Sequence, residues 1–125
     1  MVGKKKILIV EDCQEIQEMF ELALQSSGYD VDIAGNGIKL IKKIRDTKPD
    51  LILMDILMPW VDGYDLCRDI KGLDDICNIP IIIVTCKTAP EDIQKGFDAG
   101  ATEYLEKPVE IDKLLQTVAS VLAQN

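Results

Sequence analysis

Three runs of consecutive apolar residues place the strongest limit on how this chain can fold. They cover residues 7–10, 51–54 and 81–84. A run without polar alternation is typical of a strand that is buried on both faces, as in a parallel sheet covered by helices on each side. Residues 29–34 and 103–105 complete a predicted set of five strands. The sequence therefore predicts an α/β protein built on a parallel sheet.

Five segments with apolar residues at helical spacing alternate with these strands. They cover residues 14–27, 38–48, 64–70, 91–99 and 111–123. Within three of them, we expect Met19, Ile38 and Phe97 to face the core beside their apolar neighbours. Residues 58–63 are expected to form a loop, in which Trp60 either covers a site or contacts a partner.

Length and charge exclude several classes of function. The 125 residues are expected to form one domain, residues 1–125, with no output domain attached. The formal net charge is −8, which argues against nucleic acid as a partner because phosphate contacts require clustered Lys and Arg. No apolar run is long enough to span a membrane, and the N-terminus lacks a signal-peptide pattern. We therefore expect a cytoplasmic protein without membrane contacts.

The cysteines do not indicate a metal site. Cys13, Cys67, Cys77 and Cys86 lack C-x-x-C spacing, and the chain contains no histidine. A zinc site would need all four thiolates from scattered segments. The sequence instead predicts free thiols, most of them buried.

Polar residues follow four of the five predicted strands. Glu11 and Asp12 follow the first, Asp55 the third, Thr85 ends the fourth, and Lys107 follows the fifth. Because parallel strands present their carboxyl ends at one sheet edge, we expect these groups to converge there. Converging carboxylates need a cation, and oxygen ligands without His or Cys suit Mg²⁺. A carboxylate, a hydroxyl and an ammonium beside that cation are suited to phosphoryl transfer.

At these residues the chain resembles the receiver domain of two-component response regulators. The resemblance covers nearly the whole chain, in the order and spacing of the family. It rests on residues 7–12 (ILIVED), 55–59 (DILMP), 62–63 (DG), 79–85 (IPIIIVT), 98–101 (DAGA) and 104–108 (YLEKP).

This resemblance implies a flavodoxin-like, doubly wound sheet with strand order 2-1-3-4-5 and five helices. It implies that Asp55 accepts a phosphoryl group, with Thr85 and Lys107 contacting that group. Mg²⁺ (or Mn²⁺) would be bound by Glu11, Asp12, Asp55 and the backbone carbonyl of Leu57. Tyr104 matches the aromatic residue that moves together with Thr85 in the family's switch. The Lys107–Pro108 bond is expected to be cis.

Two positions depart from what a fast-cycling receiver would need. Leu57 is apolar and cannot orient an attacking water, whereas Lys87 is basic and can hold a phosphoryl group electrostatically. Since both positions flank the phosphoryl group in the family, the sequence predicts a long-lived phosphorylated state.

The resemblance also implies partners. A sensor histidine kinase or a phosphotransfer protein would supply the phosphoryl group. A downstream protein would bind the face formed by the fourth helix, fifth strand and fifth helix, and the chain would be a monomer or a weak, phosphorylation-dependent dimer. The alternative is a degenerate receiver that acts as a phosphorylation-independent docking module. A haloacid-dehalogenase-like phosphatase would need a second Asp where Leu57 stands, and three carboxylates argue against a flavin phosphate site.

Overall fold

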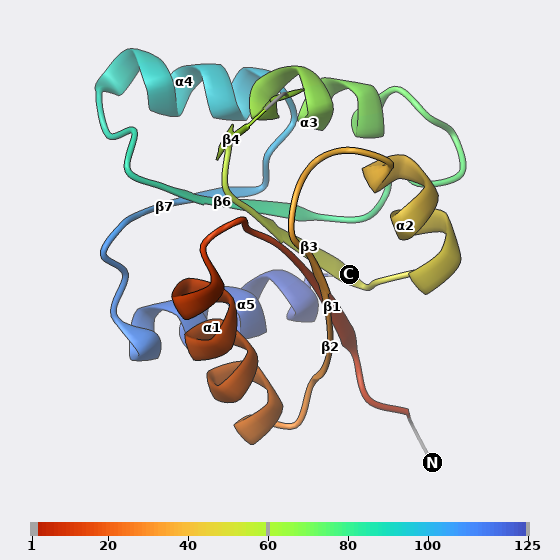
Figure 1. The fold of residues 1–125 in the computed structure, drawn as a ribbon, viewed down its shortest axis with the longest axis vertical. Helices are drawn as coiled ribbons and strands as arrows, with labels where there is room; N and C mark the ends of the chain where they lie inside the picture. The colour runs from red at the N-terminus through yellow and green to blue at the C-terminus, as the bar shows by residue number, and fades with distance from the viewer. Residues whose placement is uncertain (1–2, 60, 125) are drawn as a thin grey trace.

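A five-stranded parallel sheet forms the centre of the molecule (Figure 1). The computed structural model describes residues 3–59 and 61–124, so Trp60 lies outside the described residues. The strand order is β2-β1-β3-β6-β7, which is the predicted order 2-1-3-4-5 of the main strands. These strands are β1 (Lys6–Val10), β2 (Asp30–Ala34), β3 (Leu51–Met54), β6 (Ile81–Thr85) and β7 (Glu103–Glu106).

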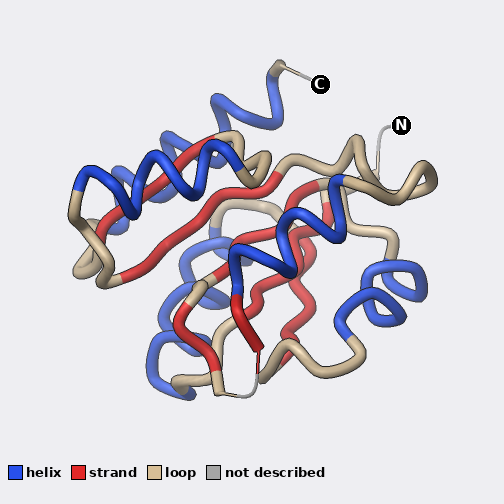
Figure 2. The backbone as a smooth tube through the Cα atoms, turned by 90° about the horizontal axis from the view of Figure 1, so that it is seen from above, coloured by secondary structure: helices blue, strands red, loops and turns tan. Residues whose placement is uncertain are grey.

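Five helices cover the two faces of this sheet, as the sequence predicts. Figure 1 shows α1 (Gln14–Ser26) and α5 (Ile111–Ala123) on one face of the sheet and α2 (Leu40–Thr47), α3 (Gly63–Lys71) and α4 (Pro90–Asp98) on the other. Figure 2 shows the same helices on both sides of the strands from above. Each layer of helices packs against one face of the sheet, and a separate cluster of buried apolar side chains lies between them. Burial of apolar area on both faces is the main favourable contribution to the stability of such a fold.

Strand burial follows the sequence pattern. Every residue of β3 and β6 is buried, whereas β2 at the sheet edge is only half-buried. An edge strand has a neighbouring strand on only one side and is more accessible to solvent. It therefore tolerates the polar residues Asp30 and Asp32, which a central strand would exclude. The two strands with polar residues and mostly incomplete burial, β2 and β7, are therefore the two edge strands.

The segment 58–63 is more regular than a loop, which corrects the prediction. It takes part in a short antiparallel pair of strands, β4 (Leu57–Met58) and β5 (Val61–Asp62). Asp62 is the N-cap residue of α3, and its carboxylate accepts hydrogen bonds from the N–H groups of Tyr64 (2.8 Å) and Asp65 (3.4 Å).

Three apolar side chains expected in the core are exposed, so this part of the prediction is wrong. The exposed fractions are 44% for Met19, 55% for Ile38 and 42% for Phe97. Ile38 precedes α2, which begins only at Leu40. On α4 it is Gly96 that is buried, against Ile83 and Tyr104, and Phe97 is turned outward.

The four cysteines are free, as predicted, but most are not buried. Only Cys67 on α3 is buried, whereas Cys13 and Cys86 are exposed and Cys77 is intermediate. Cys86 follows β6 directly and Cys13 lies just before α1, so both are at the sheet edge where side chains reach solvent rather than the core. Within the described chain, no helix has the length and apolar character required to cross a membrane.

Candidate functional site

The site is built where β1, β3 and β7 end. The backbone N–H groups of Glu11, Asp55 and Lys107 each donate to a carbonyl group of a neighbouring strand, so the sheet fixes the position of all three residues. The acceptors are Ala34 (3.1 Å), Val10 (3.0 Å) and Thr85 (2.9 Å), respectively. Three residues far apart in sequence therefore present their side chains at one edge of the sheet.

Lys107 joins the two buried carboxylates of this edge. Its ammonium lies 2.5 Å from Glu11 Oε1 and 2.7 Å from Asp55 Oδ2. The side chains are nearly enclosed, with exposed fractions of 11% for Lys107, 3% for Glu11 and 7% for Asp55. Unpaired burial of these charges would cost several kcal/mol, so the ammonium is a requirement of the arrangement.

The pKa values of this cluster reflect burial and pairing. Burial alone would lower the pKa of Lys107, but its hydrogen bonds to Asp55 and Glu11 outweigh burial and raise that pKa above its ordinary value. Burial raises the pKa of Glu11, and the hydrogen bond from Lys107 opposes this rise only in part. Glu11 thus depends on a nearby cation to stay ionised.

Backbone groups satisfy the remaining carboxylate oxygens. The N–H of Leu57 donates to Asp55 Oδ1 at 2.8 Å, and the N–H of Cys13 donates to Glu11 Oε2 at 3.2 Å. Among the described residues, no buried side-chain N or O atom lacks a hydrogen-bond partner. Both carboxylates are therefore held in fixed orientations.

A divalent cation fits the chemistry of these donors, although no metal cluster is preformed. The donors are carboxylate oxygens without His or Cys, as Mg²⁺ prefers. Asp12, the third expected ligand, is exposed next to Glu11. In the described part of the chain, no three acidic, His or Cys side chains are gathered closely enough to hold a metal ion. Lys107 supplies the positive charge between Glu11 and Asp55 instead.

Thr85, Lys87 and Tyr104 form a second group beside this cluster. Thr85 is fully buried at the end of β6, and its hydroxyl accepts a long hydrogen bond of 3.5 Å from the Lys87 N–H. The Tyr104 hydroxyl donates to the Lys87 carbonyl at 2.7 Å, which links β7 to the segment after β6. Burial is the main cause that raises the pKa of Tyr104, so this hydroxyl stays protonated as a donor.

Leu57 and Lys87, the two residues with a predicted influence on phosphoryl lifetime, line the same hollow beside β4 and β5. Leu57 belongs to β4, and its side chain is 45% exposed. The Lys87 ammonium lies 3.9 Å from a carboxylate oxygen of Asp92 on α4, so it pairs with Asp92 rather than with Asp55. No hydrogen bond joins Lys87 to Asp55 among the described residues.

Sequence reasoning missed two residues that shape the site. The Gln17 amide donates to the Glu11 carbonyl at 2.5 Å and ties α1 to the end of β1. Gly63 packs so closely against Ile56 that an added Cβ would collide with the Ile56 Cα. The Asp62–Gly63 pair signals this close turn, whereas nothing in the sequence distinguishes Gln17 from other polar helix residues.

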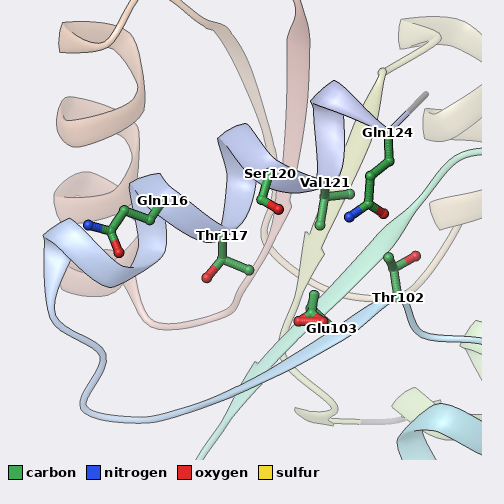
Figure 3. Close-up of a pocket in the computed structure, with 7 residues that line it drawn as sticks. All are labelled: Thr102, Glu103, Gln116, Thr117, Ser120, Val121 and Gln124. Atoms are coloured by element: carbon green, nitrogen blue, oxygen red, sulfur yellow. The ribbon is translucent and has the colours of Figure 1, made fainter.

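A separate hollow lies at the opposite end of β7 and takes no part in this site. Its volume is about 240 Å³, and Figure 3 shows that polar side chains of α5 and the start of β7 line it. These are Thr102, Glu103, Gln116, Thr117, Ser120 and Gln124, together with Val121. It shares no residue with the Glu11–Asp55–Lys107 cluster.

Comparison with known proteins identifies the family of this chain. The model of the response regulator receiver domain family matches residues 7–119. The response regulator MprA of Mycobacterium tuberculosis is 32% identical over 117 residues, which is 94% of this chain and 50% of MprA. The chain thus spans about half the length of the curated relatives it matches.

Two solved structures of similar proteins superpose closely. The chemotaxis response regulator CheY4 of Vibrio cholerae has a TM-score of 0.88 at 32% identity, with 95% of this chain and 99% of that chain covered. A CheY-like receiver domain protein of Methanospirillum hungatei has a TM-score of 0.90 at 30% identity, with 98% and 96% covered. The chain belongs to the response regulator receiver domain family of two-component signalling, whose members are signalling switches rather than conventional enzymes.

Proposed function

We propose that Asp55 accepts a phosphoryl group from a phosphohistidine of a sensor kinase or phosphotransfer protein. The observation that carries this proposal is the buried Asp55 carboxylate, which is held on one oxygen by the Leu57 N–H and on the other by Lys107. A fixed carboxylate at a strand end is preorganised for attack, because little of its motion remains to be lost.

The transfer of the phosphoryl group from histidine to Asp55 needs no oxidant, reductant or other co-reactant. An Asp55 carboxylate oxygen forms a bond to phosphorus, the bond between phosphorus and the histidine nitrogen breaks, and the neutral imidazole leaves after taking up a proton. Lys107 turns from the carboxylate toward the new phosphoryl oxygens, whose negative charge it partly neutralises. Mg²⁺, held by Glu11, Asp12, Asp55 and the Leu57 carbonyl, would supply the rest of the positive charge.

The same site supports a switch. The buried Thr85 hydroxyl is a donor that a phosphoryl group on Asp55 would attract, and the Lys87 N–H is its present neighbour. A shift of Thr85 would disturb the segment whose Lys87 carbonyl holds Tyr104. Phosphorylation would thereby favour a second state of Tyr104, since a ligand shifts an equilibrium only through contacts that differ between the two states.

The output surface would be the face of α4, β7 and α5. Phe97 of α4 is 42% exposed, and its ring centroid lies 6.5 Å from that of Tyr104. A partner in contact with Phe97 would therefore respond to the position of Tyr104.

The expected absence of an output domain, the expected cytoplasmic location and the expected monomer or weak dimer stay predictions.

Labelling with a small-molecule phosphodonor tests this function. Wild-type protein incubated with labelled acetyl phosphate and Mg²⁺ should gain a label that hydroxylamine removes, as expected for an acyl phosphate. Asp55→Asn should gain none. If wild type and Asp55→Asn stay equally unlabelled, the alternative of a phosphorylation-independent docking module is correct.

A further inference from the structure

The ten residues 39–48 carry an unusual charge for this chain. They contain five cations and one acid, a net charge of +4, so the rest of the chain of net charge −8 carries −12. The cations are Lys39, Lys42, Lys43, Arg45 and Lys48. Positive charge is therefore concentrated on α2 and its two ends.

Three of these cations, Lys39, Lys42 and Lys43, line an open hollow next to β2. The hollow has a volume of about 350 Å³ between the end of β2 and α2. Leu40 and Ile44 are buried in the core on the inner side of α2, so the lysines occupy the outer side. Ile38 is 55% exposed beside these lysines. The hollow is lined by Ile33, Ala34, Gly35, Asn36, Ile38, Lys39, Lys42, Lys43 and Asp46.

Most of this positive charge is available for an external partner. Lys42 pairs with Asp46 at 2.6 Å, but its side chain is 74% exposed. Among the described residues, the ammonium groups of Lys39 and Lys43 form no ion pair, whereas Arg45 pairs with Asp75. Unpaired lysines at the rim of a hollow attract anionic groups and increase the rate of association.

Backbone strain gives a second, independent observation. In the described chain, Lys39 (φ 60°) and Lys48 (φ 50°) are the only residues other than glycine with positive φ, and they flank α2. The left-handed conformation is costly for a side chain such as lysine, whereas Gly or Asn adopts it readily. Strain of this kind is concentrated at functional sites. At Lys39, which lines the hollow, the side chain keeps a charge at the expense of stability.

We propose that the hollow formed by Ile38, Lys39, Lys42 and Lys43, here called the α2 basic face, docks an acidic segment of a partner protein. Glu or Asp side chains of that segment would pair with the lysines, and one apolar side chain would cover Ile38. This surface differs from the α4, β7 and α5 face and shares no residue with the Asp55 site. A single exposed isoleucine is too small for membrane insertion.

Fluorescence anisotropy with a labelled acidic peptide tests the proposal. The probe is a short peptide of glutamates around one leucine, compared with the same peptide in which glutamine replaces glutamate. The full chain should bind the acidic probe, more weakly at about 0.15 M salt than at lower salt, and should not bind the glutamine probe. Lys39→Ala/Lys42→Ala/Lys43→Ala should weaken binding about tenfold. The matched control Lys4→Ala/Lys5→Ala/Lys113→Ala removes the same charge elsewhere and should bind as wild type.

A second variant separates charge from folding. Lys39→Asn fits the left-handed backbone, so it should raise the unfolding temperature while it weakens binding of the acidic probe. The proposal is overturned if the acidic probe fails to bind, or if the two triple variants lose affinity equally. It is also overturned if a single-stranded oligonucleotide or anionic vesicles bind more tightly than the probe. A dimer of the chain that the α2 triple variant abolishes would assign this face to a second copy instead.

Discussion

The Lys107 ammonium contacts Asp55 Oδ2 at 2.7 Å, although 52 residues separate the two in sequence. The same ammonium contacts Glu11 Oε1, so one cation joins the ends of three strands. This contact explains how a chain can keep an ionised carboxylate at the end of a fully apolar strand. It also puts Lys107 next to the carboxylate that is proposed to form the bond to phosphorus.

Removal of the Lys107 charge should destabilise the metal-free protein. Lys107→Met leaves Glu11 and Asp55 buried without a cation, and we expect the free energy of unfolding to fall by about 3 kcal/mol at pH 7. Urea unfolding followed by circular dichroism measures this change. Lys113→Met, an exposed position on α5, is the matched control and should change stability little.

The loss should depend on pH in a defined direction. Burial already raises the pKa of Glu11, and loss of the hydrogen bond from Lys107 should raise it further. A folded-state pKa above the unfolded value means that the folded state binds more protons, so stability falls as pH rises through that interval. Lys107→Met should therefore differ less from wild type at pH 5 than at pH 8. An equal difference at both pH values would contradict the pairing.

Mg²⁺ should stabilise the wild-type protein through the expected ligands. At a concentration ten times the dissociation constant, binding to the folded state alone adds about 1.4 kcal/mol to the free energy of unfolding. Thermal unfolding with and without Mg²⁺ measures this gain, which Asp12→Asn and Glu11→Gln should each reduce. Asp75→Asn removes an acid that pairs with Arg45 far from the site, and should keep the full gain.

Gly63→Ala should disturb both stability and the site. The added Cβ would collide with the backbone of Ile56, the residue after Asp55, so we expect a loss of about 2–3 kcal/mol and slower phosphorylation. Gly72→Ala is the control, since a Cβ there meets only ordinary contacts of 3.5 Å or more. Similar unfolding free energies for the two variants would show that the segment after Asp55 yields to the added methyl group.

The lifetime of the phosphorylated state should depend on Leu57. Leu57→Asn places a polar group that can orient an attacking water, so dephosphorylation should become severalfold faster. Intact-mass measurements after removal of the phosphodonor give the decay rate. Leu22→Asn, at an exposed position of α1, should decay as wild type. A wild-type half-life of seconds in Mg²⁺ would disprove the predicted long-lived state.

Much of the fold was predictable because three of its five main strands consist mainly of uninterrupted apolar runs. Residues 51–54 and 81–84 are apolar throughout, and the structure buries every one of them. The pair β4–β5 was not predictable, because strands of two residues show no periodicity. Phe97 was misplaced because a helical pattern fixes a face only approximately, and Gly96 allows Tyr104 to approach α4 on the neighbouring side.

The sequence was sufficient to predict which residues form the site, but not how their side chains contact one another. The sequence indicated that Glu11, Asp55 and Lys107 would meet, since parallel strands end at one edge of the sheet. It did not indicate that Lys107 would bridge both carboxylates, because a flexible lysine side chain has no sequence pattern for its direction. The tie from Gln17 to the Glu11 carbonyl was missed for the same reason.

Intact-mass analysis after incubation with acetyl phosphate and Mg²⁺ tests the role of Asp55 most directly. Wild-type protein should gain the mass of one phosphoryl group, and Asp62→Asn, which removes a nearby carboxylate outside the Lys107 cluster, should gain the same. Asp55→Asn should gain none, and wild type without Mg²⁺ should react far more slowly. A phosphoryl group on Asp55→Asn, or none on wild type, would contradict the assignment of Asp55 as the phosphoacceptor.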